Sequence, residues 1–248
     1  MKKNKKRTKK VNNSKVVIIF SFLLIIVIIL YTVLNSQMLN SKNVEINGNK
    51  YVKSEDIIKI LDIKDDKNIF RYNINNMERI LLSNKYIDKI KIKRKLPNTL
   101  SINITEKDIV ANLYNGEVYC YIDKNGTFID KFDEDNKDDN IIKVNIDYNL
   151  DNLQNINFDN KENEKSLLSL IDYIKEESVY KKIKSIDMTN ANTINIYTKD
   201  DVHVLLNKGE ELKYNVSRLA AILSDLQNKN QIGGELDLST GKYALYRH

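Results

Sequence analysis

The side chains that could perform covalent or metal chemistry are few in this chain of 248 residues. It contains one cysteine, Cys120, and two histidines, His203 and His248. A thiolate nucleophile needs a neighbouring base, and a zinc site needs several ligands grouped together. Cys120 stands in Y-C-Y, His203 stands in V-H-V, and His248 is the last residue. This pattern predicts no catalytic residue, no metal site and no cofactor site.

The main enzymatic alternative is a membrane-anchored cell-wall enzyme, either a sortase-like transpeptidase or a hydrolase. A sortase-like enzyme orders its residues His, Cys, Arg, whereas Cys120 here precedes His203. A thiol between two aromatic residues on a strand is more typical of a small packed side chain. Acidic residues gather in 130–140, where a solvated loop offers no pocket to shift the pKa of a general acid. The sequence therefore favours a binding protein.

One segment is apolar enough to cross a membrane. Residues 16–34 carry no charge, and about 20 apolar helical residues span the hydrocarbon core. Eight Lys and Arg residues lie within 1–15, and the first acidic residue is Glu45, so the positive-inside rule predicts a cytoplasmic tail. A secretory signal is the competing interpretation, but its apolar stretch usually has only about 7 to 15 residues before a small-x-small cleavage site. The sequence L-N-S-Q-M at 34–38 offers no such site, which favours an uncleaved anchor.

The net charge of +6 does not predict a nucleic-acid partner. The eight basic residues at the N-terminus carry +8, so the rest of the chain carries −2. A basic segment beside a span is explained by topology and by attraction to anionic lipid. A single cysteine also permits no intrachain disulfide, so two packed cores must stabilise the part outside the membrane.

Residues 43–107 have the pattern of a β-α-α-β-β module, which follows a linker at 35–42. Helices are predicted at 54–61, where Ser54 is the expected N-cap, and at 75–83. Apolar and polar residues alternate on both sides of a turn at 95–99, which predicts a hairpin with one buried face. The residues expected to face the core are Val44, Ile46, Ile57, Ile58, Ile60, Leu61, Met77, Ile80, Leu81, Ile90, Ile92, Leu100, Ile102 and Ile104.

This module resembles the POTRA domain of the FtsQ/DivIB family of bacterial cell-division proteins. The resemblance rests on the P-N-T-L turn at 97–100, the E-K pair at 106–107 and the order of the elements just after an anchor. It implies a scaffold, not an enzyme. POTRA domains also occur in secretion and assembly proteins, so a POTRA-type accessory protein of that kind is a further alternative.

Basic residues follow one strand of the module, namely Lys89, Lys91, Lys93, Arg94 and Lys95. A charged strand of this kind limits aggregation as a solvated face. The same residues would also suit a contact with anionic lipid or an acidic partner. The sequence favours the solvated face and leaves the contact open.

Residues 108–248 predict a second domain, a mixed β-sheet with flanking helices. Strands are expected near 109–113, 118–122, 127–129, 183–188, 193–199 and 202–206, and helices at 164–178 and from 209–213 to just before Gly233. Polar residues predict connections at 130–140 and 155–165. The motifs V-A-x-L, Y-x-Y-I-D and N-G-T resemble the start of the FtsQ/DivIB β-domain, although Ile109 stands where that family has Pro.

Two final strands are predicted at 235–238 and 242–247, joined at Ser239-Thr240-Gly241. The resemblance implies that the last strand pairs with a partner called FtsB or DivIC by β-augmentation, in which backbone groups give the affinity. Ser239 replaces the family's usual Arg, and Thr240 stands where an aromatic or larger residue is common. A backbone role does not depend on side-chain identity and is therefore compatible with both departures. An ordinary strand that closes the sheet is an equal alternative. The predicted partner-binding residues are Leu236, Asp237, Leu238, Ser239, Thr240, Gly241, Lys242, Tyr243, Ala244, Leu245 and Tyr246.

Together these patterns predict an α+β protein with a cytoplasmic tail (1–15), a transmembrane helix (16–34), a linker (35–42), a POTRA domain (43–107) and a β-domain (108–248). The resemblance implies a scaffold of the division machinery that binds FtsB/DivIC-like and FtsL-like proteins outside the membrane. It would connect them to septal peptidoglycan synthesis. The expected location is the cytoplasmic membrane at the division septum, with the C-terminus outside.

Overall fold

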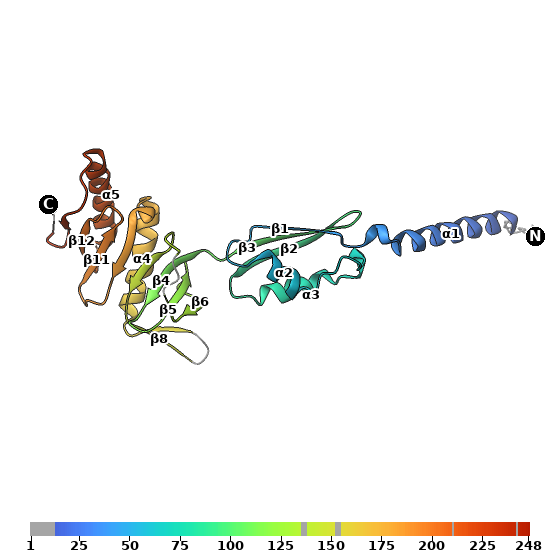
Figure 1. The fold of residues 1–248 in the computed structure, drawn as a ribbon, viewed down its shortest axis with the longest axis horizontal. Helices are drawn as coiled ribbons and strands as arrows, with labels where there is room; N and C mark the ends of the chain where they lie inside the picture. Colours follow the sequence, from blue (N-terminus) through green and yellow to red (C-terminus); the bar gives the residue numbers. More distant parts are fainter. Residues whose placement is uncertain (1–12, 135–137, 152–154, 210, 242) are drawn as a thin grey trace, which may run out of the picture. The chain divides into compact units, whose positions relative to one another are not determined.

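The computed structural model describes residues 13–134, 138–151, 155–209, 211–241 and 243–248. The chain divides into two compact units, Met1–Glu106 and Lys107–His248 (Figure 1). Both combine helices with a β-sheet, which confirms the predicted α+β class.

The first unit begins with helix α1 (Asn13–Leu34), which is followed by a short 3-10 helix, η1 (Gln37–Leu39). Over Lys15–Leu34 the helix is long and apolar enough to cross a membrane, and its large apolar side chains are exposed. A helix satisfies its own backbone hydrogen bonds, so an apolar exposed helix is suited to lipid. One such helix fits a single-pass membrane protein.

The POTRA-type module of this unit is a three-stranded sheet covered by two helices on one face. Its elements are β1 (Asn43–Asn47), α2 (Ser54–Ile60), η2 (Ile69–Arg71), α3 (Ile74–Leu82), β2 (Ile87–Lys95) and β3 (Thr99–Glu106). The strand order is β1-β3-β2, with β1 parallel and β2 antiparallel to β3. Ile57, Leu81, Leu100 and Ile102 are fully buried between sheet and helices. Burying one such side chain contributes about 1.5–3 kcal/mol.

Three predictions about these helices were wrong. Lys53, not Ser54, is the N-cap of α2, and the Ser54 hydroxyl instead accepts a hydrogen bond from the Asn49 amide at 3.2 Å. Ile60 and Ile80 are exposed although both were expected to face the core. In each helix the buried pair is spaced i, i+4, and the exposed isoleucine at i+3 lies at the margin of that stripe. Asn73 does cap α3, because its side chain accepts from the Asn76 N–H.

The second unit is a nine-stranded sheet with the strand order β14-β13-β12-β11-β10-β7-β4-β5-β6. Its strands are β4 (Ile109–Tyr114), β5 (Tyr119–Asp123), β6 (Phe128–Phe132), β7 (Ile142–Asn145), β10 (Ile183–Asp187), β11 (Thr193–Thr198), β12 (His203–Asn207), β13 (Glu235–Asp237) and β14 (Leu245–Arg247). The remaining elements are the hairpin β8 (Tyr148–Leu150) and β9 (Ile156–Phe158), the helices α4 (Lys161–Glu176) and α5 (Leu212–Asn228), and η3 (Tyr180–Lys182).

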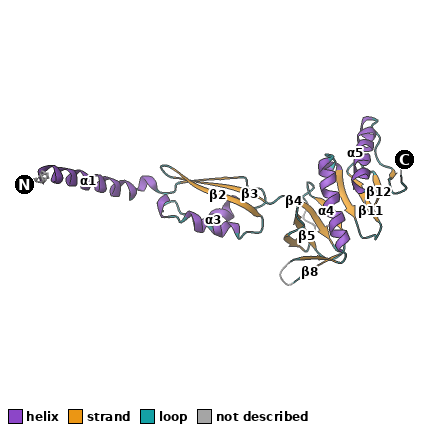
Figure 2. Ribbon diagram, turned by 180° about the vertical axis from the view of Figure 1, so that it is seen from behind, coloured by secondary structure: helices purple, strands orange, loops and turns teal. Residues whose placement is uncertain are grey.

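Helices α4 and α5 pack against one face of this sheet (Figure 2). Ile186, Ile196, Val204 and Leu236 are register neighbours on four strands, and all are fully buried. They meet the apolar side of the two helices, including Leu170, Ile174, Val216 and Leu219. Leu168 on α4 and Ile222 on α5 pack against this core but are only partly buried.

Four local predictions in this unit were incomplete or wrong. The segment 155–165 is not only a polar connection, because β9 pairs with β8 and α4 already begins at Lys161. Strand β6 extends to Phe132, inside the predicted 130–140 loop. Strands β7 and β8 were not predicted. The last strand spans Leu245–Arg247 instead of 242–247, and Lys242 lies outside the described residues.

The carboxylate of Glu106 closes the turn before α2. It accepts from the N–H groups of Tyr51 and Val52, each at 2.9 Å. Val52 is buried, and a buried N–H group without an acceptor costs about 1–3 kcal/mol. The Glu106 carboxylate at the end of β3 is thus hydrogen-bonded to the turn that leads into α2.

We expect Glu106→Ala to lower the free energy of unfolding of the module by about 1–3 kcal/mol, because two N–H groups lose their acceptor. Denaturant unfolding monitored by circular dichroism measures this change. Asp88→Ala is the control, since its exposed carboxylate contacts only its neighbour Lys89, at 3.8 Å, and should change stability by less than about 0.5 kcal/mol. Equal effects of the two variants would contradict the role given to Glu106.

Candidate partner-binding site

The outer edge of the nine-stranded sheet is formed by β14. Strand β13 pairs in parallel with β12, and β14 pairs antiparallel with β13, with Leu236 opposite Tyr246. β14 is the terminal strand of the sheet, so one of its long sides pairs with no strand among the described residues. An edge strand presents N–H and C=O groups that can pair with another chain.

A close approach of backbones positions β14. A Cβ atom at Gly234, where φ is +93°, would lie 2.6 Å from the Arg247 carbonyl oxygen and 2.8 Å from the Tyr246 hydroxyl. Only glycine permits this approach without strain. The Tyr246 hydroxyl donates to the Gly233 carbonyl at 2.8 Å. Leu236 and Leu238 are buried in the core and fix β13.

The turn before β14 is held by a polar cluster. Asp237 Oδ1 accepts from the Ser239 N–H at 2.8 Å and from its hydroxyl at 2.6 Å. The Ser239 hydroxyl is the main reason that the pKa of Asp237 is lowered, and the Ser239 N–H and Arg247 act in the same direction. The carbonyls of Ser239 and Gly241 accept from Asn207 and Arg218. Ser239 thus has a structural role at the position where the resembled family has Arg.

The predicted partner-binding residues fall into two groups. Leu236 and Leu238 are buried, and Asp237, Ser239 and Tyr246 are partly buried. These five support the edge or its turn. The residues available to a partner are exposed, and Tyr243 has 84% of its surface accessible. These exposed residues are Thr240, Gly241, Tyr243, Ala244 and Leu245.

The sequence did not reveal a row of side chains that runs from this edge across the open face of the sheet. Tyr197, His203, Glu235 and Arg247 are successive register neighbours on β11, β12, β13 and β14. The Tyr197 and His203 rings stack with centroids 4.8 Å apart, and Arg247 lies 3.5 Å from Glu235. Alternation in T-I-N-I-Y-T places Tyr197 opposite the core, but only the register of the strands shows that the four residues are adjacent.

The residues considered for chemistry are not arranged for catalysis. Cys120 is fully buried, and burial raises the pKa of its thiol to about 12. A nucleophilic cysteine needs the opposite shift. His203 contacts Asn195 Oδ1 at 3.0 Å and lies on the open face. The described part of the chain contains no group of three His, Cys, Asp or Glu residues that could hold a metal ion.

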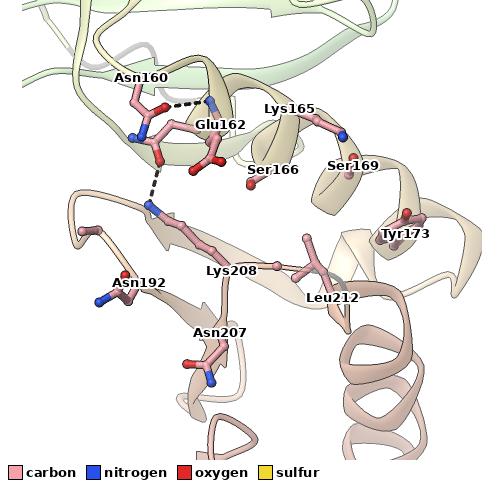
Figure 3. Close-up of a pocket in the computed structure, with 13 residues that line it drawn as sticks. Asn160, Glu162, Lys165, Ser166, Ser169, Tyr173, Asn192, Asn207, Lys208 and Leu212 are labelled. Atoms are coloured by element: carbon pink, nitrogen blue, oxygen red, sulfur yellow. Dashed lines mark hydrogen bonds between the residues drawn. The ribbon is translucent and has the colours of Figure 1, made fainter.

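A polar cavity of about 740 Å³ lies between the start of α4, the β10–β11 turn and the start of α5 (Figure 3). The Lys208 ammonium group donates to Asn163 Oδ1 at 2.9 Å and to the carbonyls of Met188 and Asn190 at 2.9 and 2.6 Å. Burial lowers the pKa of Lys208, while Asp147 and Asp187 oppose that shift. All three of its N–H donors have acceptors, so Lys208 connects three segments and is not available as a base.

Comparisons with known proteins match nearly the whole part of the chain that follows α1. A model of the POTRA domain, FtsQ-type, matches residues 39–107, and a model of the cell division protein FtsQ/DivIB C-terminal region matches residues 111–239. The second match covers more than half of the chain and ends before β14.

Curated relatives agree with these matches. The cell division protein DivIB of Clostridium tetani is 32% identical over 190 residues, which cover 74% of this chain and 69% of the relative. DivIB of Clostridium acetobutylicum is 30% identical over 188 residues, covering 68% and 71%. The cell division protein FtsQ of Geotalea daltonii is 24% identical over 200 residues, covering 79% and 71%. The resemblance to the FtsQ/DivIB family, predicted from the P-N-T-L and E-K motifs, is confirmed.

We expect Ser239→Ala to raise the pKa of Asp237 toward its ordinary value, because the carboxylate loses its closest donor. The folded-state pKa lies below the unfolded value, so the stabilisation by Asp237 is present above about pH 4 and is lost as the pH falls through the folded-state pKa. Carboxyl carbon shifts of Asp237, followed by NMR during a pH titration, measure the change. Thr240→Ala, in the same turn, should leave the titration unchanged, and an equal shift in that control would refute the assignment.

Proposed function

The chain belongs to the FtsQ/DivIB family of bacterial cell-division proteins, and from this premise we propose that it is a membrane-anchored scaffold that binds its partner at the β14 edge. The partners proposed are the FtsB/DivIC-like and FtsL-like division proteins. Through them the scaffold connects to the synthesis of septal peptidoglycan. The comparisons support the cell-division role through the names of the relatives.

The observation that carries the binding proposal is the position of β14 as the outermost strand. Strand addition there would use backbone groups for affinity and alternate side chains for specificity. Tyr243 and Leu245 are exposed beside this edge. The neighbouring row Tyr197, His203, Glu235 and Arg247 extends the surface onto the open face of the sheet.

The proposed topology follows from the distribution of charge. The basic tail 1–15 lies in the cytoplasm, 16–34 cross the membrane, and the short segment 35–42, whose last residues pack on the module, leads to the POTRA domain at 43–107 and the β-domain at 108–248 outside. The septum is the proposed location. The proposed role involves no catalytic step. Burial raises the pKa of the Cys120 thiol, which makes it a poor nucleophile and supports a binding role.

Site-specific photocrosslinking in the full-length protein tests the proposed edge. A photoreactive residue at Tyr243 or at Leu245 should crosslink to the outer segment of an FtsB/DivIC-like protein in nanodiscs. Both positions are exposed, so the substitutions leave the core unchanged. Lys131 on β6 is the matched control, because it is exposed on the opposite edge of the same sheet and should give no crosslink.

Crosslinks at Lys131 without crosslinks at Tyr243 and Leu245 would overturn the site while leaving the family unchanged. A second variant that lacks residues 241–248 should lose binding and retain the circular dichroism spectrum of the intact protein. Retention of binding by that variant would also contradict strand addition at β14.

A further inference from the structure

The chain passes from α1 into the POTRA-type module through a hydrogen-bonded junction. The buried side chain of Asn68 donates to the carbonyl of Leu34, the last residue of α1, at 2.7 Å. Its oxygen accepts from the N–H of Phe70 at 2.9 Å. Asn68 therefore caps one of the carbonyls that a helix end leaves without an intrahelical donor. The same side chain places Phe70 close to the end of the membrane helix.

The segment after η1 is bound to the same part of the module. Ser41 is fully buried, and its hydroxyl oxygen lies 2.7 Å from the Lys64 carbonyl and 3.1 Å from the Tyr72 hydroxyl. The Ser41 N–H donates to the Lys67 carbonyl at 2.9 Å. Leu39 is buried as well. Residues 39–41 are thus part of the folded module and not a free tether.

Three apolar side chains are exposed around this junction. They are Met38 with 67%, Phe70 with 47% and Leu96 with 68% of their surfaces accessible. Met38 is four residues beyond Leu34, so it lies within about 14 Å of the end of the helix even in a fully extended chain. Leu96 belongs to the β2–β3 turn, where Asn98 accepts from the N–H of Asn43 at 3.3 Å.

The turn of the hairpin and the segment between α2 and α3 lie at the same end of the module (Figure 1). Arg94 joins them, because its guanidinium donates to the carbonyls of Ile69 at 2.8 Å and Tyr72 at 2.6 Å. It also lies over the Phe70 ring, 5.7 Å from the centroid. Two contacts therefore hold Phe70 in an exposed position. Asn68 accepts from its backbone N–H, and the Arg94 guanidinium lies over its ring.

The charged groups around these side chains are of both signs. Lys42 and Arg71 are exposed beside them, Lys95 pairs with Glu45, and Lys67 lies over the Tyr72 ring. Acidic groups are present in the same segment, where Asp62 pairs with Lys64 and where Asp65 and Asp66 are exposed. Exposed apolar residues interleaved with Lys and Arg are typical of a surface that lies in a membrane interface.

We propose that Met38, Phe70 and Leu96 form a membrane footprint that rests in the outer leaflet of the bilayer spanned by α1. The lipid surface is the occupant that the structure favours, because the footprint is continuous with the membrane helix through Asn68 and Ser41. Apolar and aromatic side chains would enter the interface, while Lys42 and Arg71 face the headgroups. The inference rests on the membrane anchor and is independent of the β14 edge.

The footprint would restrict how far the module can tilt on its anchor. A single helix followed by a flexible linker would let the outer part sample many orientations. A hydrogen-bonded junction and a second contact with the bilayer remove most of that freedom. The module then presents the same face to the membrane in every copy.

The chain contains no tryptophan, so one introduced Trp provides a specific fluorescence reporter. Met38→Trp, Phe70→Trp and Leu96→Trp are made singly in the full-length protein. Each is reconstituted in nanodiscs of phosphatidylcholine that carries bromine on its acyl chains, with or without phosphatidylglycerol. Bromine quenches only a Trp that reaches the bilayer.

The matched control is Leu82→Trp. Leu82 has the same 47% exposure as Phe70 but lies at the last residue of α3. All three footprint positions should lose fluorescence to bromine relative to Leu82→Trp, and the loss should persist in phosphatidylcholine alone. Circular dichroism establishes that each variant is folded.

Two results would overturn the proposal. In the first, bromine quenches the three footprint variants no more than it quenches Leu82→Trp. This end of the module would then stay in water. Quenching that appears only with phosphatidylglycerol would show that charge attraction, and not apolar insertion, brings the module to the bilayer. Neither result would bear on partner binding at β14.

Discussion

The apolar layer between the nine-stranded sheet and helices α4 and α5 is the interaction on which the second unit, Lys107–His248, depends. Since the chain has one cysteine, no intrachain disulfide supports this layer. The helices cover one face of the sheet only, and the last strand of the sheet is held from within by Leu236, Leu238 and Tyr246. The buried layer therefore fixes the position of β14 while its outer backbone edge stays available. A strand so placed can add a partner strand without any rearrangement of the core.

The two ends of the part of the chain that follows α1 use similar means to present exposed groups in fixed positions. At β14 the close approach to Gly234 and the bonds of Ser239 to Asp237 hold the strand and its turn. At the junction with α1 the bonds of Asn68 hold Phe70 in place, and the bonds of Ser41 hold the segment that follows Met38. In both cases the positioning groups are polar, and they are largely hidden. This arrangement suits a protein that acts by binding, because binding to a rigid, preorganised surface costs less conformational entropy.

The parts of the fold that were predictable from sequence are those with long periodic patterns. The apolar run of α1, the alternation in the β2–β3 hairpin and the helical spacing of apolar residues in α5 each determine an element by themselves. The α5 residues are Leu212, Val216, Leu219, Leu223 and Leu226. Strands β7, β8 and β9 have three or four residues, too few for a period to be recognised. Ile60 and Ile80 were misplaced because both lie next to the core stripe of a short helix. The roles of Asn68, Ser41 and the Tyr197–Arg247 row depend on contacts between distant segments, which no local pattern contains. The edge position of β14 is likewise a property of the whole sheet.

The central claim is that the backbone of β14 binds the partner. Amide hydrogen exchange of the full-length protein in nanodiscs, measured with and without the outer segment of an FtsB/DivIC-like protein, tests it most directly. An edge strand has outward N–H groups that a partner strand would engage. The account predicts that binding slows exchange at residues of Leu245–Arg247 and leaves the opposite edge strand β6 unchanged. If the partner binds, the exchange rates in β14 stay unchanged and amides elsewhere become protected, the claim is contradicted.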